Sequence, residues 1–224
     1  MKNTFYSFLL ITLFFYAGCS NKDVQLPTIE LDGITEIQNH SNIWIFFDIK
    51  GSDTVAVLNK NNKILNTHWI FNIDRRLAMK TVVPQLQKMQ ESRNKDSMHK
   101  KEGMNNYFSF ANTKSKNISL VKFDQTKFIS DKKEYDTILE KYSKNQILEI
   151  DIQNESLSLN KKVMEIELLL EKINNVLSKD TLKPPKIILQ YHENTNYHNY
   201  LKTKAYIQKH NIVIDINEYI YSVK

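Results

Sequence analysis

ILEIDIQNESLSLN, residues 147–160, is the stretch that decides the fold. Apolar and acidic residues largely alternate over Ile147–Ile152, which is typical of a strand with one buried face. After the polar pair Asn154-Glu155, leucines alternate with serines over Ser156–Leu159. A turn at this polar pair would let the second run lie beside the first. The stretch therefore predicts a β-hairpin.

Two helices and two more strands are predicted after this hairpin. Apolar residues between Val163 and Leu177 are spaced as on one face of an amphipathic helix, and Asn160 is the predicted N-cap. We expect a short buried strand at Ile187–Leu189, a helix at about Asn196–Lys209 and a last strand at Ile212–Ile216. The order from residue 147 onward is therefore β-β-α-β-α-β.

The preceding part of the chain predicts a first lobe of similar content. The apolar stripe Val82–Met89 indicates a helix, with Thr81 as its N-cap and Pro84 in its first turn, where a missing N–H costs little. A hairpin, a helix and strands would also fit a diverged copy of the second lobe. The strands predicted here are Ile43–Ile49, Thr54–Leu58, His68–Ile73, Tyr107–Ala111 and Ile118–Phe123.

These patterns together predict an α+β chain of two small sheet-plus-helix lobes. We place the first lobe at residues 41–130 and the second at residues 147–224. Residues 131–146 are highly charged, with apolar positions at helical spacing, and predict a connecting helix. Residues 19–40 are polar and contain Pro27, so we expect a tether there.

The beginning of the chain has a different composition from the rest. Lys2 is the only charged residue before position 19, and Ala17-Gly18 directly precedes Cys19. The apolar run Phe5–Tyr16 is shorter than the about 20 residues that a membrane-spanning helix needs. A basic start, a short apolar run and small residues before a cleavage site are typical of a secretory signal. Residues 1–18 are therefore predicted to be a signal peptide.

This arrangement resembles the lipobox of bacterial lipoproteins, in which Cys19 would become the lipidated N-terminus. Tyr16 departs from that pattern, because an aliphatic residue is more usual three positions before the cysteine. The resemblance implies a fatty acid such as palmitate on Cys19 and a lipid-anchored protein of the cell envelope. The outer membrane is the expected site, with the protein facing the periplasm or the cell surface. The alternatives are an unlipidated secreted protein and a short uncleaved anchor.

The composition excludes several classes of function. Cys19 is the only cysteine, so a lipidated chain has no thiol left for a disulfide, a nucleophile or a zinc–thiolate site. The net charge is +6, but the basic residues do not cluster or alternate with aromatic ones, so no nucleic-acid partner is expected. Four glycines in 224 residues make a phosphate-cradling loop hard to arrange. No cofactor is predicted.

The second lobe resembles the periplasmic domain of the ExbD/TolR family of proton-driven envelope motors. The resemblance rests on the strand SLSLN (156–160) that ends at a helix, the segment KIILQ (186–190), and the polar loop before Tyr197. His198 stands where the family often has glycine. The likeness covers about residues 147–220. It implies a binding or scaffolding role in the envelope, towards peptidoglycan or an envelope protein.

One departure from that family concerns proton coupling. Family members that drive motors carry a carboxylate in an N-terminal membrane helix, where a buried ionisable group is costly and usually functional. The apolar run Phe5–Tyr16 contains neither Asp nor Glu, and the predicted cleavage removes it. The resemblance therefore implies a retained periplasmic domain without the proton-coupling part.

The loop after the strand at Ile187–Leu189 holds the residues most suited to ligand binding. His192-Glu193 and His198 could hold zinc, or act as a base with an orienting partner, and Tyr197 lies between them. No HExxH pattern is present, however, and tyrosine-rich loops before helices commonly serve packing and capping. We therefore predict a non-enzymatic protein without a bound metal. A metal-dependent hydrolase using His192, Glu193 and His198 is the alternative.

Asp74-Arg75-Arg76 is a second charged cluster. Two arginines beside a turn could bind an anion. A turn whose charges face water or pair with one another is the simpler expectation, and we assign the cluster no binding role.

Overall fold

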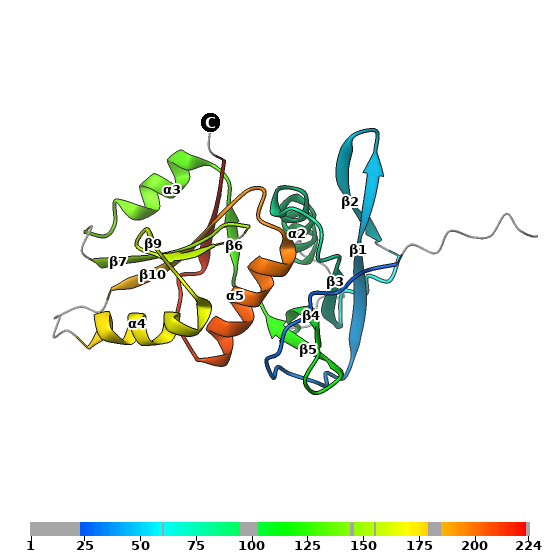
Figure 1. Ribbon diagram of the computed structural model, residues 1–224. Coiled ribbons are helices and arrows are strands. Elements are labelled where there is room, and N and C mark those ends of the chain that lie inside the picture. The colour runs from blue at the N-terminus through cyan, green and yellow to red at the C-terminus, as the bar shows by residue number, and fades with distance from the viewer. Residues whose placement is uncertain are drawn as a thin grey trace, which may run out of the picture.

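Two mixed β-sheets lie on either side of a layer that contains the helices labelled α2 and α5 (Figure 1). The computed structural model describes residues 23–59, 61–94, 103–143, 146–154, 156–178 and 185–222. The predicted signal peptide and Cys19 lie outside the described residues. Four α-helices occur in the described part of the chain, together with the two sheets. The predicted α+β class, with two sheet-plus-helix lobes, is confirmed.

The first sheet has the strand order β2-β1-β3-β4-β5. The central strands β1, β3 and β4 are parallel, and the edge strands β2 and β5 each form an antiparallel hairpin with their neighbour. Its strands are β1 (His40–Lys50), β2 (Asp53–Asn59), β3 (His68–Ile73), β4 (Asn106–Asn112) and β5 (Asn117–Lys122).

The second sheet has the strand order β6-β11-β10-β7-β8-β9. Strands β6, β11, β10 and β7 are parallel, whereas β8 and β9 continue the sheet in antiparallel pairs. Its strands are β6 (Lys127–Ile129), β7 (Ile147–Ile152), β8 (Leu157–Leu159), β9 (Lys162–Met164), β10 (Lys186–His192) and β11 (Asn217–Tyr221). The α-helices in the described residues are α2 (Met79–Asn94), α3 (Lys132–Leu139), α4 (Leu169–Leu177) and α5 (Tyr197–Lys209).

The two sheets share one topology. In the first lobe a hairpin, β1–β2, is followed by β3, helix α2 and β4, and the strands lie in the order β2-β1-β3-β4. In the second lobe β7–β8, β10, α5 and β11 repeat this sequence of elements, in the order β8-β7-β10-β11. Helix α4 precedes β10, and the described chain before β3 has no helix at the corresponding place. The repeat of topology agrees with the diverged-copy interpretation.

Helices α2 and α5 begin side by side, and each is capped by backbone of the other lobe. The N–H of Met79 donates to the carbonyl of Thr195 at 2.8 Å, and the N–H of Tyr197 donates to the carbonyl of Leu77 at the same distance. A β-bridge joins Ala78 to the residue before Tyr197. The first N–H groups of a helix have no partner within the helix. At this joint the opposite lobe supplies the missing acceptors.

Two further bonds complete the joint and explain one wrong prediction. The N–H of Lys80 donates to the carbonyl of Glu193 at 2.9 Å, and the N–H of His198 donates to the carbonyl of Arg75 at 3.3 Å. Thr81 was predicted as the N-cap of α2, but the helix already begins at Met79. The residue before the helix is Ala78, whose side chain cannot accept a hydrogen bond. Backbone carbonyls from the second lobe cap the helix instead. Pro84 accordingly lies deeper in the helix than its predicted first turn.

One hydrophobic core extends through both lobes. Its centre is aromatic: the ring of Phe108 on β4 stacks on Phe123 with centroids 3.7 Å apart. Tyr197 and Tyr200 of α5 meet Phe108 edge-on, at 5.7 and 6.1 Å. Edge-to-face ring contacts add stability beyond the area that they bury. Since these rings come from both lobes, we expect the lobes to fold as one unit.

The segment predicted as a free tether packs on the first lobe in its described part. Ile29 is only 3% exposed and belongs to the central core. Ile34 exchanges two backbone hydrogen bonds with Leu120 on β5. At Gly33 a Cβ atom would lie 2.9 Å from the carbonyl oxygen of Leu120, so only glycine permits this approach. The tether prediction is wrong here, because apolar side chains between the polar ones find a sheet to cover.

The boundary between the lobes also differs from the prediction. Strand β6 lies within the predicted first lobe, yet it pairs with β11 at the edge of the second sheet. Helix α3 was predicted as a connector, but it packs on that same sheet, where Tyr135 stacks on Tyr219 with centroids 4.0 Å apart. The second lobe therefore begins at β6.

Two predicted elements of the second lobe are placed differently. Asn160 was expected to cap a long helix, but Asn160 and Lys161 adopt positive φ angles of 48° and 67° in the turn between β8 and β9. Asparagine tolerates that conformation well. Val163 is 73% exposed on β9, and the helix itself begins only at Leu169. The last strand was predicted at Ile212–Ile216 but covers Asn217–Tyr221.

Candidate functional site

His192 and Glu193 lie at the joint between the lobes. His192 ends β10, and its ring meets that of Tyr221 edge-on at 5.5 Å, while its Nδ1 accepts a hydrogen bond from the N–H of Asn194. The N–H of Glu193 donates to the carbonyl of Tyr221 at 2.7 Å. The carbonyl of Glu193 caps α2 as described above. The backbone of this loop thus holds the joint together.

Tyr197 and His198 are held in the first turn of α5. Tyr197 is fully buried, and burial raises the pKa of its hydroxyl well above the ordinary value. His198 is half-buried; burial, and then the charges of Arg75 and Lys202, lower the pKa of its imidazole. Within the described chain, no group of three or more His, Cys, Asp or Glu residues could hold a metal ion. Among the described residues, His192, Glu193 and His198 therefore form no such group.

Asp74 and Arg76 form the local pair that the sequence predicts. The guanidinium of Arg76 donates to both carboxylate oxygens of buried Asp74, at 2.8 and 2.7 Å. The same guanidinium lies 4.1 Å above the ring of Phe47. The pair is therefore used within the fold.

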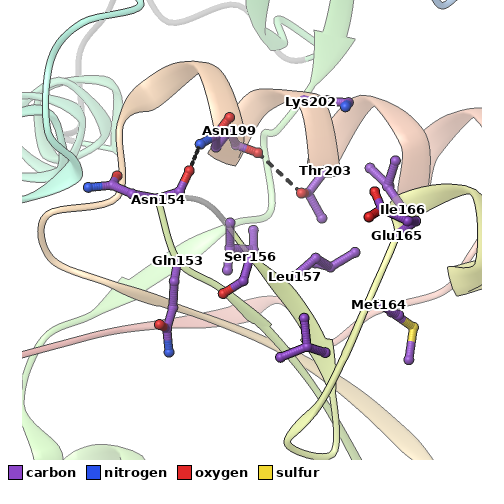
Figure 2. A pocket seen from close by; sticks show the side chains of 12 residues that line it. Gln153, Asn154, Ser156, Leu157, Met164, Glu165, Ile166, Asn199, Lys202 and Thr203 are labelled. Atoms are coloured by element: carbon purple, nitrogen blue, oxygen red, sulfur yellow. Dashed lines mark hydrogen bonds between the residues drawn. The ribbon is translucent and has the colours of Figure 1, made fainter.

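A small cavity of about 250 Å³ opens between the β8–β9 hairpin and α5 (Figure 2). Several of its polar groups bond to one another. The amide of Asn199 donates to the carbonyl of Asn154, and the hydroxyl of Thr203 donates to the carbonyl of Asn199 at 3.1 Å. Asn154 also accepts a hydrogen bond from the N–H of Asn196 at 2.8 Å. The contacts of Asn154 tie the turn between β7 and β8 to the beginning of α5, so we interpret the cavity as part of the scaffold.

A larger groove lies between the lobes. It consists of two adjoining cavities of about 470 and 530 Å³, which share the segment Asp124–Thr126 and Ile216. We call their combined lining the inter-lobe groove. The first lobe contributes the end of α2 and the beginning of β4, and the second lobe contributes α5 and the approach to β11. The polar residues of the lining are Gln90, Arg93, Asn94, Asn105, Asn106, Lys122, Asp124, Gln125, Thr126, Lys127, Lys204, Gln208 and Asp215.

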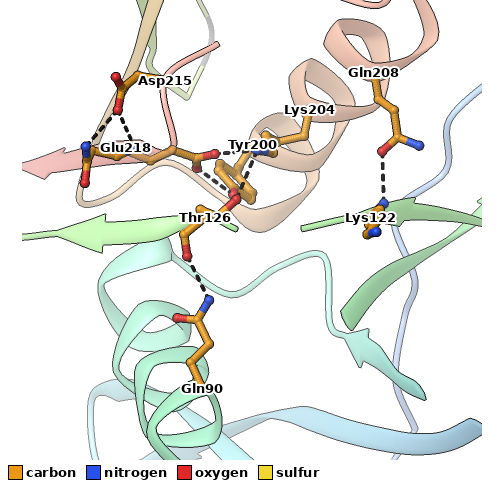
Figure 3. Close-up of polar contacts among 9 residues, drawn as sticks. Gln90, Lys122, Thr126, Tyr200, Lys204, Gln208, Asp215 and Glu218 are labelled. Carbon is orange, nitrogen blue, oxygen red and sulfur yellow. Dashed lines mark hydrogen bonds and ion pairs between the residues drawn. The ribbon is translucent and has the colours of Figure 1, made fainter. Parts of the chain in front are cut away.

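A buried polar network supports the groove (Figure 3). The ammonium of Lys204 pairs with the carboxylate of Glu218, which also accepts a hydrogen bond from the hydroxyl of Tyr200 at 2.8 Å. Burial, and then the charge of Glu218, raise the pKa of that hydroxyl well above its ordinary value. On the opposite side, the amide of Gln90 donates to the carbonyl of Thr126 at 2.8 Å. The network connects α5, β11 and the segment between the lobes.

Arg93 is held firmly at the mouth of the groove. Its guanidinium lies 3.7 Å above the ring of Trp69 and donates to the carbonyl of Thr67 at 3.3 and 3.2 Å. Burial lowers the pKa of Arg93 to about 10, which still leaves it charged at neutral pH. Arg93 was not among the binding residues predicted from the sequence. Arg93 belongs to no sequence motif, and the apolar stripe on α2 does not show which polar residues of the helix face a groove.

No family model, curated protein or solved structure matches this chain. None of the helices in the described residues is long and apolar enough to cross a membrane. The inter-lobe groove and the joint are therefore the features from which a function can be proposed.

Proposed function

We propose that this chain is a lipid-anchored, non-enzymatic binding module of the bacterial cell envelope, which holds peptidoglycan in the inter-lobe groove. The groove carries the proposal, because its size is that of a typical ligand site and both lobes contribute to it. The lipobox-like segment before Cys19 and the likeness of the second lobe to ExbD/TolR periplasmic domains support an envelope location.

The chemistry of the lining favours a polar ligand with little net charge. Most charges in or beside the groove are already paired: Lys122 with Asp124 at 3.2 Å, and Asp215 with Lys186 at 3.2 Å. Lys204 is paired with Glu218 in the buried network. Amide and hydroxyl groups make up much of the remaining lining. Such groups suit the hydroxyl and acetamido groups of a glycan.

The anchor would keep the groove close to the membrane. The carbonyl of Gln25 accepts a hydrogen bond from the N–H of Arg75, so the chain is attached to the first lobe from this point. The segment from Cys19 to Gln25 can span at most about 20 Å when fully extended. The ligand is therefore expected to be an envelope polymer whose distance from the membrane surface is no larger than the diameter of the protein.

Cys19→Ser is expected to abolish incorporation of labelled fatty acid and to release the protein from the membrane fraction. The physical reason is that acyl chains on this residue would supply the membrane affinity. Cell fractionation and radiolabelling measure both effects. An unprocessed Cys19→Ser protein that stays in the membrane would indicate an uncleaved signal anchor instead.

Co-sedimentation with purified peptidoglycan sacculi tests the binding function. The full-length protein in mild detergent is expected to sediment with sacculi in a saturable manner. Gln125→Arg places a bulky charge in the groove from an exposed position and should weaken retention about tenfold or more. Gln153→Arg is the matched control, an exposed glutamine outside the groove, and should bind as the unmodified chain does. Absence of retention, or equal retention of both variants, would contradict the proposal.

A further inference from the structure

Asn106 is a buried polar residue that the fold leaves incompletely satisfied. It lies at the beginning of β4, is 4% exposed and lines the groove. Its backbone N–H donates to a carboxylate oxygen of Asp124. Its side-chain Oδ1, however, has no hydrogen-bond partner among the described residues. Buried polar atoms are almost always paired in native proteins, so an unpaired acceptor in a groove indicates a missing donor.

Asn112 provides an internal comparison at the other end of the same strand. It is 2% exposed, and its amide nitrogen donates to the carbonyl of Leu31 at 2.9 Å and to the carboxylate of Asp32 at 3.2 Å. Its Oδ1 accepts from the N–H groups of Lys114 and Ser115, at 3.0 and 3.2 Å. This asparagine is fully used by the fold, whereas Asn106 is not. The difference points to a role for Asn106 outside folding.

Two more residues that line the same cavity of about 470 Å³ each have a buried side-chain atom without a hydrogen-bond partner. The Nε of Arg93 is a buried donor and Oδ2 of Asp124 a buried acceptor, and neither has a hydrogen-bond partner in the described chain. Lys122 neutralises Asp124 as an ion pair at 3.2 Å, outside hydrogen-bond alignment. The cavity therefore offers one donor and two acceptors.

A secondary amide complements this set, because it has one N–H to donate and one carbonyl to accept. We propose that Asn106, Asp124 and Arg93 form a subsite for a secondary amide group, an inference that rests on the proposed envelope-binding function. The amide N–H donates to Asn106 or Asp124, and the amide carbonyl accepts from Arg93. In peptidoglycan this chemistry occurs in the acetamido groups of the sugars and in the peptide stems.

The charges at the subsite argue against an ionic ligand. An ammonium would meet the acceptors of Asn106 and Asp124 but would be repelled by the guanidinium of Arg93. A carboxylate would be attracted by Arg93 but has no donor for the acceptors of Asn106 and Asp124. A neutral amide meets neither penalty and uses both kinds of partner.

Three soluble probes distinguish the possible ligands of the full-length protein, and calorimetry or chemical-shift mapping can follow them. We expect tri-N-acetylchitotriose to bind at least about tenfold more tightly than cellotriose, an uncharged trisaccharide with the same glycosidic linkage that has hydroxyl groups in place of the acetamido groups. Binding of an N-acetylated trialanine amide in place of the sugar would assign the subsite to the stem peptide. Equal affinity for cellotriose and tri-N-acetylchitotriose, with no binding of the peptide, would overturn the amide subsite.

Asn106→Ala and Asn112→Ala are matched variants for this test. Asn106→Ala is expected to weaken binding of the preferred probe at least about tenfold while the unfolding midpoint stays unchanged or rises, because an unpaired buried acceptor is removed. Asn112→Ala should lower the midpoint and leave the affinity unchanged. A lower midpoint with unchanged affinity for Asn106→Ala would show that its role is structural.

The outcomes also separate this inference from the proposed function. If the protein is retained on sacculi and the acetylated probes do not displace it, the envelope function stands and the amide subsite is overturned. If the protein binds an amide probe, Asn106→Ala loses that binding, and the protein is not retained on sacculi, the subsite is supported and the choice of peptidoglycan is overturned.

Discussion

Replacing Glu218 by leucine is expected to lower the free energy of unfolding by about 3–5 kcal/mol. Glu218 is fully buried on β11 and pairs with Lys204, which is itself 7% exposed. Without the carboxylate, a lysine ammonium would remain in the interior with no opposite charge, and the hydroxyl of Tyr200 would lose its acceptor. Urea unfolding followed by far-ultraviolet circular dichroism measures the change.

The double variant Glu218→Leu/Lys204→Met identifies the cause of that loss. Because both charges are then removed, much of the lost stability should return. Asp136→Ala is the exposed counterpart, since it breaks the solvent-facing pair with Lys132, and it should hardly move the midpoint. If the double variant is as unstable as Glu218→Leu, the loss comes from packing and not from an unpaired charge.

Phe108→Ala is expected to destabilise both lobes together, by about 3–5 kcal/mol. Phe108 is fully buried in the first lobe, where it stacks on Phe123, and it also contacts Tyr197 and Tyr200 of the second lobe. Its removal leaves a cavity at the centre of a core that both sheets share. The two lobes should therefore lose stability by the same amount.

Separate probes for the two lobes can test this cooperativity. Both tryptophans, Trp44 and Trp69, lie in the first lobe, so their fluorescence reports its unfolding. Hydrogen exchange of the β10 amides reports the second lobe. We expect the two probes to shift together in Phe108→Ala and to shift little in Phe46→Ala, whose ring is only partly buried. Unchanged protection of β10 in Phe108→Ala would mean that the lobes unfold independently.

The joint and the groove lie at different ends of the same two helices. The N-terminal turns of α2 and α5 are fixed to each other by reciprocal backbone bonds. Farther along these helices, Gln90 and Arg93 of α2 and Lys204 and Gln208 of α5 line the groove. A ligand site held by rigid elements needs less ordering when the ligand binds. The joint thus gives His192-Glu193 a structural role that supports the proposed binding surface.

Patterns within short segments were sufficient to predict most of the elements. Alternation over Ile147–Ile152 predicts β7, and the spacing of apolar residues from about Asn196 to Lys209 predicts α5. These predictions succeeded because burial of one face leaves a period in the sequence. The prediction of a long helix after Asn160 was wrong because it relied on the same kind of period. The spacing after Val163 also fits a strand, a turn and a shorter helix in succession.

The local sequence therefore determined the α+β class, the hairpins and the helix faces, and it predicts the anchor at Cys19. Only the tertiary structure decided how the lobes meet and what their groove contains. The acceptors that cap α2 are carbonyls more than a hundred residues away, such as that of Thr195 for Met79. Asn106 and Asn112 belong to the same strand. Oδ1 of Asn106 has no hydrogen-bond partner among the described residues, whereas the side chain of Asn112 is hydrogen-bonded. The partners of a polar atom depend on segments distant in the chain, and no local period records them.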